Sequence, residues 1–120
     1  MDNVMYKVTV LKTGEVIADK VKIAQDVESR ARGLLGRLSL GKGEGLVIKP
    51  CGSIHTFFMK FPIDVIFLNK KNQVIKIGRA IPPWRIYGCL FGGFLVIELQ
   101  SNALNGIEIK QGDFIGIDKM

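Results

Sequence analysis

Short apolar segments separated by turn-forming residues recur along most of the chain, and this spacing limits the folds that it can adopt. Segments such as IDVIFL and FLVIEL are long enough for strands, and the Gly, Pro and Asn residues between them favour tight turns. The stretch QDVESRARGLLGR alone has good helical spacing. We therefore predict an α+β, predominantly β fold. It is a small barrel-like or rolled antiparallel sheet with one packed α-helix at about residues 26–37.

Alternating residues predict two β-hairpins, over residues 4–24 with a turn at Gly14 and over residues 63–80 with a turn at KKNQ. The segments LVIKP and FLVIELQS predict buried strands. SIHTFFMK predicts a further strand, separated from the next by Pro62. IPPWRIYGCLFGG is predicted to be irregular because of its prolines and glycines. NGIEIKQGDFIGID predicts two short closing strands around Gly112.

Within the helix, Asp26 is the expected N-cap, and its carboxylate can accept the free N–H groups of the first turn. A set of apolar residues recurs at helical spacing and is expected to face the core. These residues are Val27, Ala31, Leu34 and Leu35. Gly33 in mid-helix indicates a close backbone approach, and Gly36 is the expected stop.

A length of 120 residues predicts a single domain over residues 1–120. The net charge of +6 marks a basic protein, with either one basic face or scattered, solvated lysines. The N-terminus alternates and has no signal-peptide pattern, and no apolar run is long enough to span a membrane. We therefore expect a cytoplasmic protein. Cys51 and Cys89 are expected to stay reduced there.

His55 is the only histidine, in a segment that also carries two phenylalanines and a methionine. If this segment is extended, His55 shares one face with Phe57, Met59 and Phe61, the composition of a core or an apolar pocket. The chain has no second histidine and no Cys-x-x-Cys pair, so we predict no metal site and no cofactor. A nucleophilic pair of His55 with either cysteine has no supporting motif.

Two carboxylates lie within apolar strands, Asp64 in IDVIFL and Glu98 in VIEL. A buried carboxylate is costly unless it is paired or hydrogen-bonded. Asp64 is expected either to accept backbone N–H groups in the Pro62 turn or to pair with an arginine. The candidate arginines are Arg30, Arg37, Arg79 and Arg85. Glu98 is expected to have a partner or to face a cavity. The two carboxylates, His55 and several arginines either line one polar pocket or form an internal structural support.

The segment PPWRIYGCLFGGF contains more large apolar residues than a Gly-rich loop can bury. It is either a partner surface, with Trp84, Arg85, Tyr87 and Phe91 as candidates, or an aromatic plug over one end of the sheet. A homodimer is one possible use of such a surface. The sequence has no ribonucleoprotein-type motif and no phosphate-binding loop, so nucleic acid is not the expected partner.

Four motifs occur in order along the chain: SRARGLLGR, SIHTFFMKFPIDVIFL, PPWR and VIEL. Together they resemble the family known as domain of unknown function 192, from about residue 20 to the C-terminus. The positions that match the family pattern are Arg30, Gly33, Leu34, Arg37, His55, Thr56, Met59, Pro62, Asp64, Phe67, Glu98, Gly112 and Asp113. The resemblance implies a small β-rich fold with one helix and no established activity. Asn102 stands where a turn glycine is common in the family.

We therefore expect a non-catalytic binding module for an unknown protein or small-molecule partner. The alternative is an enzyme or small-molecule-binding protein whose pocket is lined by His55, Asp64, Glu98 and an arginine. The ligand-site candidates are His55, Thr56, Met59, Asp64, Glu98, Arg30 and Arg37. No catalytic residue can be assigned.

Overall fold

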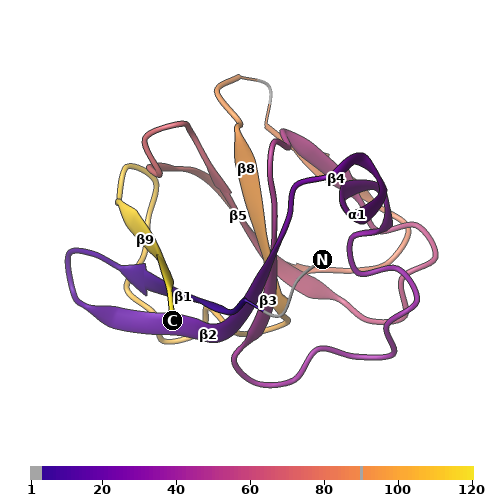
Figure 1. The fold of residues 1–120 in the computed structure, drawn as a ribbon, viewed down its shortest axis with the longest axis horizontal. Coiled ribbons are helices and arrows are strands. Elements are labelled where there is room, and N and C mark those ends of the chain that lie inside the picture. Colours follow the sequence, from indigo (N-terminus) through magenta and orange to yellow (C-terminus); the bar gives the residue numbers. More distant parts are fainter. Residues whose placement is uncertain (1–3, 90) are drawn as a thin grey trace.

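A seven-stranded sheet that curls into a half-barrel makes up most of the computed structural model, which describes residues 4–89 and 91–120 (Figure 1). The strand order is β6-β5-β8-β3-β2-β1-β9, and a separate two-stranded sheet pairs β4 with β7. The elements are β1 (Tyr6–Val10), β2 (Glu15–Ala24), α1 (Val27–Arg32), β3 (Glu44–Ile48), β4 (Ser53–His55), β5 (Ile63–Leu68), β6 (Val74–Ile81), β7 (Ile86–Gly88), β8 (Leu95–Gln100) and β9 (Ile115–Lys119). The predicted β-rich class with one helix is confirmed.

Both predicted hairpins form. The β1–β2 pair turns at Gly14, and the β5–β6 pair turns at Asn72, which like Gly14 has a positive φ. The curl brings the two ends of the sheet together, because Gln73 forms an isolated bridge with Phe114. Backbone hydrogen bonds of 2.8 Å join Val74 to residues 112 and 113 at the same place.

One strand pair departs from the predicted antiparallel sheet. Strands β2 and β3 are parallel, whereas every other pairing among the described strands is antiparallel. A parallel pair needs a long crossover, and α1 lies in the connection that supplies it. The single helix is therefore fixed over one side of the sheet, beside β4 (Figure 1).

The helix itself is shorter than predicted. It begins after Asp26, whose Oδ1 accepts the Ser29 N–H at 2.7 Å, and it ends at Gly33 with φ 51° and ψ −124°. L-residues avoid that backbone region, so Gly33 ends the helix instead of lying within it. The expectation that Val27 and Ala31 face the core is wrong, because both are exposed. Leu34 reaches the core from the turn that follows the helix.

Three other local predictions need correction. The segment SIHTFFMK is not one strand: β4 ends at His55, and Phe58 adopts a positive φ in the turns that follow. The proline- and glycine-rich segment contains β7, which pairs with β4 and is fixed by this tertiary contact. Residues 107–110 form no strand, so β9 alone closes that end of the sheet.

The central strands are buried on both faces, and every residue of β5 is buried. The concave face packs into one apolar core with Ile66, Ile97 and Leu104. The other face packs against the turn after α1, β4 and β7 through a second core that contains Leu34, Val65 and Phe67. Each central strand therefore carries alternate side chains into two different environments.

Asp64 is fully buried and links two backbone segments. Strand β6 bulges opposite it, where Ala80 has a φ of 48°. Asp64 Oδ1 accepts the Ala80 N–H at 2.8 Å, and Oδ2 accepts the Leu104 N–H at 3.0 Å. The expected backbone hydrogen bonds exist, but they come from the bulge and the turn after β8, not from the Pro62 turn. Asp64 forms no ion pair within 4.0 Å in the described part of the chain.

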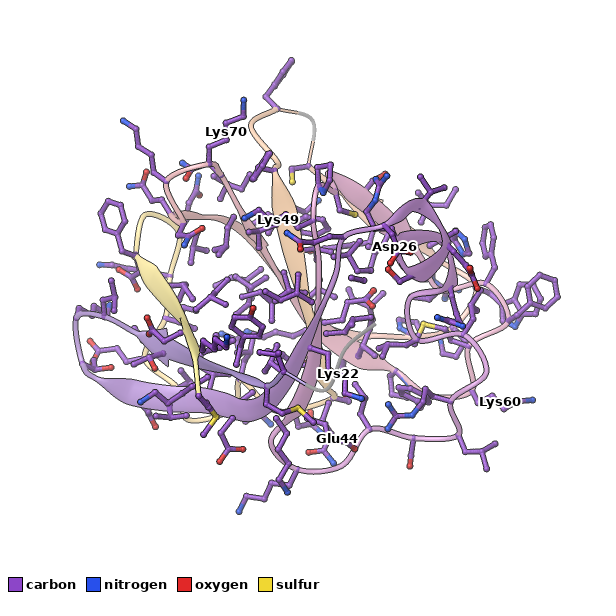
Figure 2. The ribbon with its side chains drawn as sticks, viewed as in Figure 1. Lys22, Asp26, Glu44, Lys49, Lys60 and Lys70 are labelled. Atoms are coloured by element: carbon purple, nitrogen blue, oxygen red, sulfur yellow. The ribbon has the colours of Figure 1, made fainter. Side chains whose placement is uncertain are left out.

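Basic side chains are distributed around the molecule. In Figure 2, the labelled residues Lys60 and Lys70 lie toward opposite edges of the view, and Lys22 lies between them. Among the described residues, no helix is both long and apolar enough to cross a membrane.

Replacing Asp64 with Asn is expected to destabilise the protein by about 3 kcal/mol. The amide has a single acceptor oxygen, so one of the two buried N–H groups would face an NH₂ group instead of an acceptor. Urea unfolding of the variant gives the free energy. Asp118→Asn, at an exposed position, is the matched control and is expected to change it by less than about 0.5 kcal/mol. Equal stability of the two variants would contradict the role of Asp64.

Candidate ligand-binding pocket

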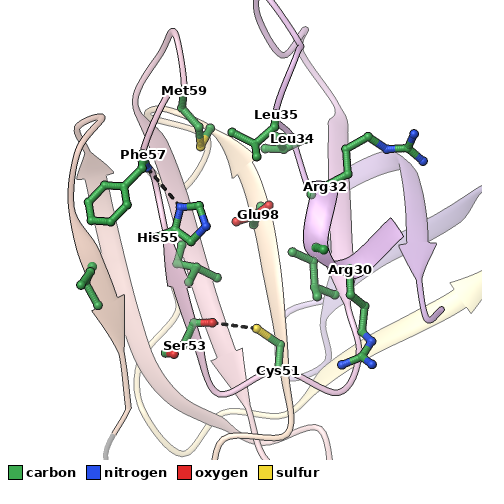
Figure 3. A pocket seen from close by; sticks show the side chains of 15 residues that line it. Arg30, Arg32, Leu34, Leu35, Cys51, Ser53, His55, Phe57, Met59 and Glu98 are labelled. Atoms are coloured by element: carbon green, nitrogen blue, oxygen red, sulfur yellow. Dashed lines mark hydrogen bonds between the residues drawn. The ribbon is translucent and has the colours of Figure 1, made fainter. Parts of the chain in front are cut away.

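A pocket of about 370 Å³ lies between the end of α1, strand β4 and the convex face of β8 (Figure 3). Its walls are mostly apolar, with Leu34, Leu35, Ile48, Ile54 and Met59 contributing. The volume falls at the lower end of the range for small-molecule sites. The pocket is therefore large enough for a small organic molecule.

Glu98 supplies the carboxyl group at the centre of this pocket (Figure 3). It lies on β8, paired with Leu46 of β3 and Val65 of β5, so it is in the middle of the sheet. Its residue surface is 3% exposed, and its Oε1 has no hydrogen-bond partner. Within the described residues it forms no ion pair within 4.0 Å. Burial raises the pKa of this carboxyl from 4.5 to about 7.

Gly33 brings the end of α1 close to Glu98. A Cβ atom on Gly33 would lie 3.8 Å from Glu98 Oε1 and 3.6 Å from the Cδ1 atom of Ile48. The positive φ of Gly33 also disfavours any side chain there. Both distances are ordinary van der Waals contacts, so the positive φ, and not the predicted close backbone approach, is what favours glycine at position 33.

Aromatic rings form one rim of the pocket. His55 stacks on Phe57, with centroids 5.1 Å apart, and Phe57 contacts Trp84 at 5.9 Å. Phe58 makes an edge contact with Trp84 at 4.7 Å. We call His55, Phe57, Phe58 and Trp84 the aromatic cluster. Of these residues, His55 and Phe57 line the pocket.

The ring of His55 is oriented by the backbone. Its Nδ1 accepts the Phe57 N–H at 3.3 Å, which leaves the proton of a neutral imidazole on Nε2. Asp64 cannot orient it, because that carboxylate is bonded to Ala80 and Leu104 on the concave side of the sheet. His55 is exposed, so it belongs to the pocket rim and not to the core.

Thr56 fixes the position of the pocket rim through hydrogen bonds. It is fully buried, and its Oγ1 donates to the Pro82 carbonyl at 2.7 Å and accepts the Arg85 N–H at 2.9 Å. Its backbone carbonyl accepts the Trp84 N–H at 3.0 Å. Thr56 therefore joins the segment after β4 to the segment before β7 and does not line the pocket.

The arginines of α1 line the pocket without approaching its centre. In Figure 3, the guanidinium groups of Arg30 and Arg32 extend away from Glu98. Arg30 donates from Nη1 to the Pro50 carbonyl at 3.4 Å, and its buried Nε lacks a partner. Arg37 lies outside this pocket and pairs with Glu44 at 3.1 Å.

Neither thiol is activated. Cys51 lines the pocket and donates to the Ser53 carbonyl at 3.0 Å, and its burial raises the pKa of the thiol. Burial likewise raises the pKa of Cys89. A nucleophilic cysteine needs the opposite shift. In residues 4–89 and 91–120, no group of three His, Cys, Asp or Glu side chains is placed to hold a metal ion.

The structure brings together four of the seven ligand-site candidates, Arg30, His55, Met59 and Glu98. Asp64, Thr56 and Arg37 lie elsewhere. The sequence reasoning did not select Cys51, Ser53, Phe57 or Ile86, which also line the pocket. Gly33 was the one sequence feature that could have pointed to the pocket wall formed by α1. The β4–β7 pairing, which forms the opposite wall (Figure 3), has no local sequence signature.

The partner-surface candidates divide into two groups. Trp84, Arg85 and Phe91 are exposed, whereas Tyr87 points inward and donates from its hydroxyl to the Ile77 carbonyl at 3.1 Å. A Cβ atom on Gly78 would lie 2.6 Å from the Tyr87 ring, so the two residues fit closely. Leu90, in the same segment, lies outside the described residues.

Comparison with known proteins identifies relatives along most of the chain. The DUF192 family model, described as Uncharacterized ACR, matches residues 8–117. A UPF0127 protein of Thermococcus sibiricus is 37% identical over 108 residues, covering 85% of this chain and 68% of that protein. A UPF0127 protein of Pyrococcus horikoshii is 34% identical over 99 residues, covering 80% of this chain and 85% of that protein.

Two crystal structures share the fold. A protein of unknown function from Novosphingobium aromaticivorans has a TM-score of 0.78 and 23% identity, covering 93% of this chain and 83% of its own. A putative transcription regulator from Sinorhizobium meliloti has a TM-score of 0.80 and 18% identity, covering 95% and 92%. At these identities, the likeness concerns the fold alone.

The raised pKa of Glu98 predicts a specific dependence of stability on pH. The pKa is about 7 in the folded protein and 4.5 without burial, so between these values the folded state binds more protons than the unfolded state. The stabilisation of the folded state by the Glu98 carboxyl is therefore fully present below pH 4.5, decreases as the pH rises, and is absent above pH 7. Relative to Glu98→Gln, the wild type is expected to lose about 2–3 kcal/mol between pH 5 and pH 8.

Urea unfolding of both proteins across this pH range measures the difference. Glu108→Gln, which removes an exposed carboxylate, is the control and is expected to show no such trend. A difference between wild type and Glu98→Gln that does not change with pH would show that Glu98 is not a desolvated, unpaired acid.

Proposed function

We propose that this chain, which belongs to the DUF192 family of uncharacterised proteins, is a non-catalytic module that binds a small organic molecule in the Glu98 pocket. The observation that carries this proposal is the buried Oε1 atom of Glu98, which has no partner and opens into a pocket with apolar walls. A buried polar atom without a partner costs free energy, and a ligand that supplies a hydrogen bond removes that cost.

The groups around the pocket favour binding over catalysis. A nucleophile needs an adjacent base, yet the thiol of Cys51 donates to the Ser53 carbonyl and its pKa is raised. The Nδ1 atom of His55 is occupied by a backbone N–H. Asp64, which the enzyme alternative requires, contributes its carboxylate to the opposite side of the sheet. An enzyme here would have to use Glu98 or the Nε2 atom of His55 as its acid or base.

The pocket proposal predicts that small organic fragments perturb the methyl groups of its walls. In ¹³C-methyl NMR spectra, shifts are expected to concentrate at Leu34, Leu35, Ile54 and Met59. Ala31→Leu, which enlarges an exposed wall residue, is expected to weaken binding about tenfold. Val27→Leu, on the same helix but outside the pocket, is the matched control.

Fragments that bind equally to Ala31→Leu, or that shift only methyl groups elsewhere, would contradict the pocket as the binding site. Recovery of fragments in chemically altered form would favour the enzyme alternative.

A second candidate function is protein contact through the aromatic cluster, and its simplest form is a homodimer. Phe58 and Trp84 are 71% and 56% exposed although their rings touch, and both residues have a positive φ. Exposed, clustered aromatic side chains are typical of interface hot spots. Tyr87 does not belong to this surface, because its ring packs against Gly78 and Phe67.

Sedimentation velocity tests the homodimer. If the aromatic cluster is its interface, Trp84→Ser is expected to weaken dimerisation at least tenfold, while Phe114→Ser, at another exposed aromatic position, leaves it unchanged. Circular dichroism and urea unfolding confirm that each variant is folded. A wild type that stays monomeric at high concentration would rule out the homodimer.

A further inference from the structure

A single acidic group, the carboxyl of Glu98, lies at the centre of the pocket. The Glu98 carboxyl lies there with its Oε1 unpartnered, in the middle of the sheet and 3% exposed. It is fixed by its backbone pairing with β3 and β5, so it cannot move to solvent without breaking the sheet. In its ionised form this group therefore needs a ligand that brings a hydrogen-bond donor.

The other ionisable groups around the pocket do not supply that donor. From α1, Arg30 and Arg32 extend their guanidinium groups away from Glu98, and neither pairs with it within 4.0 Å. From the segment before β4, Cys51 donates its proton to the Ser53 carbonyl. From β4, His55 stacks on Phe57, and its Nε2 makes no hydrogen bond to Glu98 Oε1. The carboxyl group thus lacks a countercharge in the described structure.

The remaining lining suits a cation with an apolar body. At the rim, the ring of Phe57 stacks on His55 and lies apart from Glu98 (Figure 3). Leu34, Leu35, Ile54 and Met59 offer apolar surface to an alkyl or aryl group. No carboxyl group other than that of Glu98 lines the pocket, and the guanidinium groups of Arg30 and Arg32, which also line it, are directed away from Glu98, so a ligand ammonium at the centre faces one negative charge.

We propose that the pocket binds a small primary amine in its ammonium form, with the ammonium group at Glu98 and an apolar body against the α1 and β4 walls. This inference rests on the proposed pocket function and specifies its ligand class. The ammonium donates to Oε1 and supplies the missing countercharge, and a buried carboxylate is stabilised chiefly by such a partner. A neutral alcohol supplies only the hydrogen bond, and a carboxylate ligand places two like charges together.

Binding of an ammonium ion is linked to the proton on Glu98. In the empty pocket, this carboxyl titrates with a pKa of about 7. The ammonium favours the ionised form, so binding below that pKa releases the Glu98 proton to the solvent. Affinity is therefore expected to rise as the pH increases from 6 to 8, by about tenfold, because the ionised fraction rises by that factor. An alcohol shows no such rise, and a carboxylate shows a fall.

Isothermal titration calorimetry with hexylammonium, 1-hexanol and hexanoate tests the proposal on the whole chain. Hexylammonium is expected to bind most tightly at pH 8, with an affinity about tenfold above that at pH 6 and with proton release at pH 6. In Glu98→Gln, the affinity for hexylammonium is expected to fall at least tenfold and to lose its dependence on pH. Glu108→Gln removes the same charge far from the pocket and is expected to behave as the wild type.

Three results would overturn the amine assignment: hexanoate binding more tightly than hexylammonium, an affinity for hexylammonium that is flat between pH 6 and pH 8, or unchanged binding in Glu98→Gln. If 1-hexanol or hexanoate binds and Ala31→Leu weakens it, the pocket function stands and only the ligand class fails. If none of the three probes binds, the amine assignment fails, and the methyl shifts with other fragments decide the pocket function separately.

Discussion

The burial of the central strands on both faces is the constraint on which the rest of this structure depends. Strands β3, β5 and β8 present apolar side chains to two cores, so other segments must shield both faces of the sheet from solvent. The curl of the sheet covers the concave face. The convex face is covered by a thinner layer of α1, the turn after it and the β4–β7 pair, and the pocket lies where this layer meets β8 (Figure 3).

Two buried carboxylates on neighbouring strands show how the different packing on the two faces of the sheet changes the role of an acidic side chain. Asp64 faces the concave side and accepts two backbone N–H groups, one from the β6 bulge and one from the turn after β8. Its hydrogen bonds are complete, so it acts as a structural link. Glu98 faces the other side, where no backbone donor reaches its Oε1. The same residue chemistry is therefore structural on one face and available to a ligand on the other.

The pocket rim is positioned by tertiary hydrogen bonds and close packing. Thr56 ties the segment after β4 to the segment before β7, and Tyr87 packs against Gly78 on β6. These contacts hold β4 and β7 in place although the pair is short and lies outside the main sheet. The aromatic cluster, the apolar walls and the central carboxyl group are thus set in one arrangement by residues that do not themselves face the pocket.

The sequence by itself determined the β-rich class, the two hairpins and their turns, and the cap at Asp26. It also identified Asp64 and Glu98 as carboxylates within apolar strands. These are local properties: alternation, turn chemistry and a charged residue within an apolar strand are all visible over a few residues. Asn102 also adopts the left-handed conformation expected from its turn position, with a φ of 70°. Only the tertiary structure decided that α1 ends at Gly33, that β7 forms, and that Asp64 and Glu98 face opposite sides. Helix length and the β4–β7 pairing depend on contacts between distant segments. The role of each carboxylate depends on which segments pack on the face of the sheet that it points to.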